Sequence, residues 1–130
     1  MVRKLLIFVL ILSLVIELGL TGGIFFAKAI ISKQFGVAVN ADTDFLSYIV
    51  GWLCLFVSLM IGLALWQLIQ RNSNYAVLCY LMGFFWIAIG IAIYAAFGKP
   101  DNLAIDTAKG AIIVVLTYLN QRMSPVSKRR

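Results

Sequence analysis

The sequence of 130 residues contains no histidine, two cysteines and two prolines, and charged residues make up only 12% of it. Without histidine, neither an imidazole metal site nor a histidine-based catalytic triad can form. Two cysteines alone cannot supply a structural zinc site or an iron–sulfur cluster. Glycine-rich phosphate loops and nucleophile elbows are also absent from the sequence. We therefore expect no catalytic residue, no metal and no cofactor, and a protein that is not an enzyme.

Apolar residues are abundant, at 63% of the chain. An average soluble domain is about 45–50% apolar and about 25% charged. A soluble domain of this length could not cover so much apolar side chain with so little polar surface. The length allows one domain, so we expect residues 1–130 to form a single integral membrane domain in a lipid bilayer. The net charge of +6 does not indicate nucleic-acid binding, because the basic residues lie at the chain ends and in short loops between apolar runs.

Four apolar segments approach the roughly 20 residues that a membrane-spanning helix needs. They cover residues 5–27, 45–70, 75–97 and 103–119. The fold class predicted is all-α, an antiparallel bundle of four transmembrane helices. The last segment is the weakest, because it carries Asp106 and Lys109 in its outer part, and a half-buried helix is the alternative for it.

The connections between these segments carry helix start and stop signals. Gly98 is typical of a helix C-cap, and Asp101 or Asn102 is typical of the next N-cap. Residues 40–44 are predicted to cap the second span. Residues 29–35 keep a helical pattern with Lys28 and Lys33 facing water. This segment either extends the first helix beyond the membrane or lies along the membrane surface.

Basic residues indicate the orientation, because Lys and Arg are enriched in cytoplasmic loops. One side of the membrane would collect basic residues without any acidic one: Arg3, Lys4, Arg71, Arg122, Lys128, Arg129 and Arg130. Four spans with both termini on this side satisfy the rule, so both termini are predicted to be cytoplasmic. A cleaved secretory signal ending near residues 27–29 is the alternative, and it would place the termini on opposite sides. Glu17 and the length of the first apolar run oppose cleavage.

Glu17 is the first candidate for a polar site within the membrane. It lies near the bilayer middle, where a carboxylate costs about 2.5–3.5 kcal/mol on insertion scales. Ser13, Glu17 and Thr21 recur every four residues and therefore form one polar stripe. The stripe is either a proton-titrating or cation-binding site, or a glutamate that fixes helix packing through hydrogen bonds or an ion pair.

Asp106 and Lys109 form the second candidate, since their i, i+3 spacing places them on one helix face. Lys109 lies about 6 Å nearer the outer surface than Glu17, a gap that a lysine side chain can span. One hypothesis is a Glu17–Lys109 pair with Asp106 as a competing partner. The other is a local Asp106–Lys109 pair whose lysine extends to the outer headgroups.

Small residues at four-residue steps could allow helices to approach closely. Such steps are Gly19 and Gly23, Ser58 and Gly62, the alanines 88, 92 and 96, and the alanines 104 and 108. They predict either internal packing or the contact face of a homo-oligomer. Cys54 and Cys79 lie at opposite depths, so we expect no disulfide between them.

The layout of the chain resembles the DoxX-like small four-helix membrane proteins. The similar features are Phe35-Gly36 in the long outer connection, Gly51-Trp52 early in the second span, the short turn at residues 71–74, and residues 98–101 before the fourth span. The resemblance implies a membrane accessory or assembly component, alone or in a larger membrane complex. It also implies the bacterial cytoplasmic (inner) membrane.

A second resemblance is to the small multidrug exporters, which also have four helices and a glutamate in the first. The similar residues are Glu17, Gly19, Thr21 and Lys28. This resemblance implies the alternative function, a proton-coupled exporter of lipophilic cations centred on Glu17.

Overall fold

The computed structural model describes residues 1–36, 38, 40–98 and 100–123. These residues form five helices: α1 (Val2–Phe26), α2 (Lys28–Phe35), α3 (Ala41–Ile69), α4 (Tyr75–Phe97) and α5 (Pro100–Met123). The described part of the chain contains no strand. Helices α1, α3, α4 and α5 are each long and apolar enough to cross a membrane. The all-helical fold with four candidate spans is therefore confirmed.

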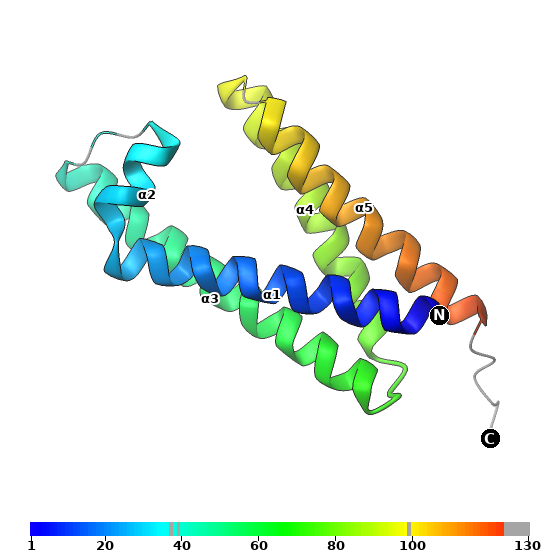
Figure 1. The fold of residues 1–130 in the computed structure, drawn as a ribbon. Coiled ribbons are helices and arrows are strands. Elements are labelled where there is room, and N and C mark those ends of the chain that lie inside the picture. The colour runs from blue at the N-terminus through cyan, green and yellow to red at the C-terminus, as the bar shows by residue number, and fades with distance from the viewer. Residues whose placement is uncertain (37, 39, 99, 124–130) are drawn as a thin grey trace.

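The long helices pack in two pairs, α1 against α3 and α4 against α5. Figure 1 shows the pairs crossing near the N-terminus and diverging toward the end of the molecule that carries α2. We call this end the α2 end, and the opposite one, with Arg3, Lys4, Arg71 and Arg122, the basic end. Arrangement of the pairs as an antiparallel bundle stays a prediction.

Three predicted boundaries were too narrow. Helix α1 begins at Val2 rather than near residue 5, α3 begins at Ala41 rather than 45, and α5 covers Pro100–Met123 rather than 103–119. The prediction counted apolar residues, whereas helical hydrogen bonds continue into the polar residues that flank them. An N-cap at Asp101 or Asn102 is wrong, because α5 already begins at Pro100. Proline suits this first position, since its missing N–H would have no helical partner.

Two predicted helix ends are confirmed. Gly98 follows α4 with a left-handed φ of 61°, and its N–H donates to Tyr94 O at 2.8 Å. At the start of α3, the Asn40 side chain accepts from the Thr43 N–H and the Thr43 hydroxyl accepts from the Asn40 N–H. This reciprocal capping box satisfies two backbone donors that the helix itself leaves free.

Helix α2 is a separate element rather than an extension of α1. The chain breaks at Ala27, with φ −135° and ψ 38°, and α2 turns away from the α1 axis (Figure 1). Lys33 is exposed, as predicted. The prediction that Lys28 faces water is wrong, because its side chain is half-buried and paired with Asp44 of α3.

Helices α4 and α5 approach each other closely at two glycines. A Cβ on Gly83 would lie 2.9 Å from Gly110 O, and a Cβ on Gly110 would lie 2.4 Å from Gly83 O. Only glycine fits on either side of this contact. Gly19 does not serve internal packing, because a Cβ there would meet no atom within 4 Å, and the alternative of a homo-oligomer face stays a prediction. The small residues that proved exposed are Gly19, Ala88, Ala92, Ala96, Ala104 and Ala108.

Both cysteines are free thiols, as expected.

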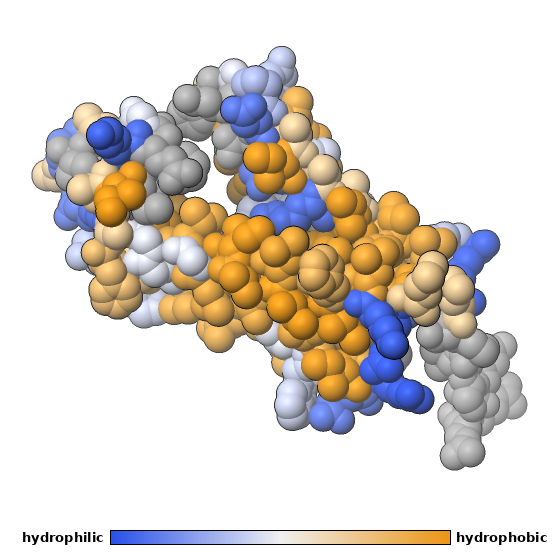
Figure 2. Space-filling model, viewed as in Figure 1, coloured by the Kyte–Doolittle hydropathy of each residue, from blue (hydrophilic) through white to orange (hydrophobic). Residues whose placement is uncertain are grey.

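The surface has the distribution that a bilayer requires. Figure 2 shows hydrophobic residues covering the middle of the visible face and hydrophilic residues gathered at its ends. Large exposed apolar side chains include Phe8, Phe56, Trp66 and Phe84. The same view shows a notch between the diverging helix pairs, with a hydrophilic patch near its base. Between the two helix pairs, the charged residues Glu17, Asp106 and Lys109 of the membrane-spanning segments come together.

Candidate functional site: a buried ion pair between the helix pairs

Glu17 lies on the one face of α1 that is buried in the protein. The buried residues of α1 repeat every three or four positions: Leu6, Leu10, Ser13, Glu17 and Thr21. This spacing places them on one side of the helix, so the carboxyl group enters the interior with the apolar side chains. Glu17 is 0% exposed, and its Oε1 accepts a hydrogen bond from Lys109 Nζ at 2.9 Å. The structure therefore joins the α1–α3 pair to the α4–α5 pair through one buried ion pair.

Lys109 has two further partners. Its Nζ lies 3.6 Å from Asp106 Oδ1 on the same helix and 3.2 Å from the ring centroid of Trp86 on α4. An ammonium over an indole face is attracted by the ring quadrupole, most strongly when both groups are shielded from water. The lysine side chain is 14% exposed and points inward rather than to the headgroups. Of the two pairing hypotheses, the structure has Glu17–Lys109 as the shorter contact and Asp106 as the competitor.

The glycine contact explains why Trp86 belongs to this site. Gly83 of α4 lies against Gly110 of α5, which fixes the register of the two helices. Trp86 lies one helical turn beyond Gly83, and Lys109 directly precedes Gly110. A side chain at either glycine would push the helices apart and draw the indole away from the ammonium. Trp86 also belongs to the buried core, and its contact with Lys109 was not predicted from the sequence.

Several buried polar side-chain atoms have no hydrogen-bond partner among the described residues, and two of them belong to Glu17 and Trp86 of this site. They include Glu17 Oε2, Trp86 Nε1 and Thr107 Oγ1. Buried polar groups are normally satisfied, so each such atom calls for an explanation. If all three charged groups were ionised, Glu17, Asp106 and Lys109 would sum to a charge of −1. The site therefore has one more carboxylate than it has cations.

Among the described residues, no hydrogen bond joins the other buried polar side chains of α1 and α5 to the charged groups of the ion pair. Ser13 is buried on the same face as Glu17. The Thr21 hydroxyl donates to the backbone oxygen of Glu17 at 2.8 Å, so it does not contact the carboxyl group. On α5, Thr117 bonds to its own helix, and Asn120 Nδ2 donates to the Tyr75 hydroxyl at 2.7 Å near the basic end. The site thus consists of Glu17, Lys109, Asp106 and Trp86.

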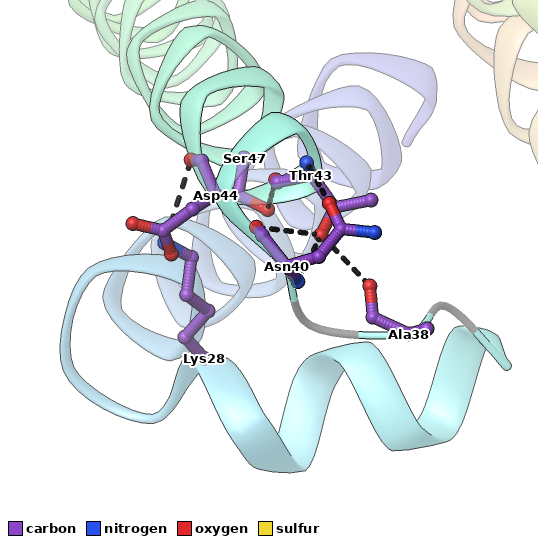
Figure 3. A network of polar contacts seen from close by, with 6 residues as sticks. All are labelled: Lys28, Ala38, Asn40, Thr43, Asp44 and Ser47. Atoms are coloured by element: carbon purple, nitrogen blue, oxygen red, sulfur yellow. Dashed lines mark hydrogen bonds and ion pairs between the residues drawn. The ribbon is translucent and has the colours of Figure 1, made fainter.

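A second lysine–carboxylate pair lies at the α2 end. Figure 3 shows Lys28 reaching from the start of α2 to Asp44, beside the capping box of α3. Lys28 Nζ also lies 4.6 Å from the centroid of the Tyr48 ring. The Asp44 side chain is 45% exposed, so water reaches this pair. Its position at the end of the apolar helices makes it a border contact.

A third contact, at the basic end, was also missed. Arg3 Nη2 donates to the backbone oxygens of Leu68 and Ile69 at 3.0 and 3.1 Å. These carbonyls belong to the last turn of α3, where the helix dipole is negative, and Leu68 O also accepts from the Arg71 N–H at 3.2 Å. The sequence analysis used Arg3 only for orientation. The available signal was the position of Arg3: it lies at the start of the first predicted span, on the same side of the membrane as the end of the second.

These features define a polytopic membrane protein whose two helix pairs are linked by a buried ion pair. Comparison with protein-family models, with curated proteins and with solved structures found no match. The site geometry is therefore the basis for the functional inference.

Proposed function

We propose that this chain is a small, non-enzymatic integral membrane protein of DoxX-like type that acts as an accessory or assembly component. The observation that supports this proposal is the environment of Glu17. An exchanger needs an accessible carboxyl group, whereas Glu17 is 0% exposed and held by Lys109 at 2.9 Å. In this proposal the ion pair holds the α1–α3 pair against the α4–α5 pair in one arrangement, which gives the protein a defined surface for its partners.

The proposed location is the bacterial cytoplasmic membrane, with both termini in the cytoplasm. Support comes from the basic end, where Arg3 contacts the end of α3 and Arg71 follows in the turn to α4. The acidic residues Asp42 and Asp44 lie at the opposite end of α3. Labelling of Ser73→Cys and Lys33→Cys with a membrane-impermeant maleimide tests this orientation in a cysteine-free background. We expect the reagent to label Lys33→Cys, but not Ser73→Cys, from the outside. Labelling of Ser73→Cys from the outside would show the opposite orientation.

A specific observation favours the alternative, a proton-coupled exporter. Glu17 Oε2 has no partner among the described residues, although it is buried within the protein. Movement of the diverging helix pairs could expose this oxygen to a lipophilic cation. The exporter alternative is therefore a direct competitor that one experiment can separate from the accessory role.

The experiment measures proton release from purified protein when tetraphenylphosphonium is added in weakly buffered detergent. The accessory role predicts no saturable release from the wild type. Saturable release that is lost in Glu17→Gln would establish exchange and overturn the proposal. Asp42→Asn is the matched control, because it removes an exposed carboxylate remote from the site.

Native electrophoresis of membranes solubilised in mild detergent tests the accessory role itself. The tagged chain is expected to migrate in an assembly larger than its 14.4 kDa mass plus detergent. Cross-linking and mass spectrometry would then separate a homo-oligomer from a complex with other subunits. Migration as a monomer under all mild conditions would contradict an assembly component.

A further inference from the structure

The charge balance of the buried site points to a ligand that the helix packing alone does not supply. Glu17, Asp106 and Lys109 are the charged groups of the site, and they carry two negative charges against one positive. The Cys54 thiol of α3 is the other titratable group near them. An ordinary thiol is neutral at pH 7, so it adds no compensating charge.

Lys109 cannot neutralise both carboxylates. Its Nζ makes a hydrogen bond to Glu17 Oε1 at 2.9 Å and lies 3.6 Å from Asp106 Oδ1. The Trp86 ring at 3.2 Å attracts the ammonium but adds no net charge. The N-terminal dipole of α5 acts mainly on the first turn, whereas Asp106 lies in the second turn of the helix that begins at Pro100. One negative charge is therefore left over inside an apolar segment.

The second observation is independent of the charge count. Glu17 Oε2 is buried without a hydrogen-bond partner among the described residues, in a side chain that is 0% exposed. An ionised carboxylate normally accepts hydrogen bonds on both oxygens, and an unsatisfied buried charge is costly. A proton on the pair of carboxyl groups removes the surplus charge and reduces this cost. It is also the one cation that needs no further space.

We propose that Glu17 and Asp106 share one bound proton at neutral pH, with Lys109 between them, so that the site is a single-proton binding site within the membrane domain. Asp106 is 14% exposed at its side chain, against 0% for Glu17, and so provides the route by which the proton exchanges with water. The proposal does not depend on the accessory role, because a resident proton requires neither transport nor a partner.

Infrared spectroscopy tests the site directly in the full-length protein reconstituted in lipid vesicles. A protonated carboxyl group gives a C=O band well separated from that of a carboxylate, and the band shifts in D₂O. We expect the wild type at pH 7 to show one carboxyl equivalent. Asp42 lies at the α2 end, is exposed, and is outside the site.

The variants distinguish a shared proton from an isolated protonated glutamate. Asp106→Asn leaves Glu17 and Lys109 as a neutral pair, and Glu17→Gln leaves Asp106 and Lys109 as one, so each variant is expected to lose the whole band. Lys109→Met removes the cation and should raise the signal to about two carboxyl equivalents. Asp42→Asn is the matched control and should leave the wild-type band unchanged.

Two outcomes would overturn the proposal. Absence of a carboxyl band from the wild type at pH 7 would show that both carboxylates are ionised, and this result does not require any variant to fold. Persistence of the band in Asp106→Asn, with normal helical circular dichroism, would show that Glu17 holds a proton by itself. The infrared band tests the bound proton, whereas the proton-release assay with tetraphenylphosphonium tests the accessory role against exchange. Failure of the first proposal is therefore distinguishable from failure of the second.

Discussion

The two lysine–carboxylate pairs of this protein have the same chemistry in different surroundings. Lys109 and Glu17 connect α5 to α1 in the interior, where the carboxylate is 0% exposed and the lysine lies over an indole ring. Lys28 and Asp44 connect α2 to α3 at the α2 end, where the carboxylate side chain is 45% exposed. The first carboxylate is fully enclosed by protein, whereas nearly half of the second is exposed.

This difference decides what each pair contributes. In an exposed ion pair, each charged group gives up favourable contacts with water in order to contact its partner. Such a pair therefore adds only about 0–1 kcal/mol to the free energy of unfolding. A buried pair adds little net stability over apolar side chains, but removal of one partner leaves an uncompensated charge and costs about 3–5 kcal/mol in soluble proteins. Removing one partner from each pair should therefore give very different results.

The largest effect is expected for Lys109→Met. The substitution keeps most of the side-chain volume but leaves Glu17 and Asp106 without their cation, and we expect a loss of about 3 kcal/mol in the free energy of unfolding. Titration with sodium dodecyl sulfate in mixed micelles, followed by circular dichroism, measures it.

The double variant Glu17→Gln with Lys109→Met checks the cause. It should recover at least half of this loss, because no buried carboxyl group then remains at position 17 without its lysine partner. Additive losses from the two substitutions would show that the pair does not link α1 to α5.

The next largest effect is expected for Gly83→Ala. Its Cβ would lie 2.9 Å from Gly110 O and 2.5 Å from Val114 Cγ2, so α4 and α5 must shift apart. We expect a loss of about 2 kcal/mol in the same unfolding titration. Gly19→Ala is the matched control, because its Cβ meets no atom within 4 Å and alanine favours helix by up to about 1 kcal/mol. Equal effects at both glycines would contradict the close contact.

A smaller effect is expected for Trp86→Phe, which keeps an aromatic ring but weakens the attraction for Lys109. We expect a loss of about 1 kcal/mol, since phenyl binds a cation less strongly than indole and leaves a gap. Trp66→Phe is the control, because Trp66 is exposed on the apolar surface. Loss of stability in Trp66→Phe but not in Trp86→Phe would show that the Trp86 ring does not stabilise the Lys109 ammonium group.

The smallest effect is expected for Lys28→Met at the exposed pair. The free energy of unfolding should fall by less than about 1 kcal/mol, and high salt should reduce the difference from the wild type. The effect of Lys109→Met should change little with salt, because its partners are buried. A salt-sensitive loss of 3 kcal/mol or more for Lys28→Met would contradict the view that exposure to water makes this pair weaker than the buried one.

The sequence was sufficient to predict the class of the fold and the residues of special interest. Apolar runs of about 20 residues with few charges are stable only as helices that bury their own backbone hydrogen bonds, so the four spans could be predicted from composition and length. Glu17, Asp106 and Lys109 could be singled out because charged residues are rare within such runs. Asn40 and Gly98 could be recognised as caps because these residue types satisfy helix ends locally.

Only the tertiary structure decided which partners these residues have. Helix periodicity gives the face on which Lys109 lies but not the neighbour of that face, and Asp106 and Glu17 were both within its reach. The choice depends on Gly83 and Gly110, whose contact fixes α4 against α5 and brings Trp86 to the ammonium. The predicted four-residue steps did not include Gly83 or Gly110, whereas Gly19, which they did include, is exposed. Local sequence thus determined what each helix contains, whereas contacts between helices distant in the chain determined that Lys109 pairs with Glu17 while Asp106 lies beside the same ammonium group.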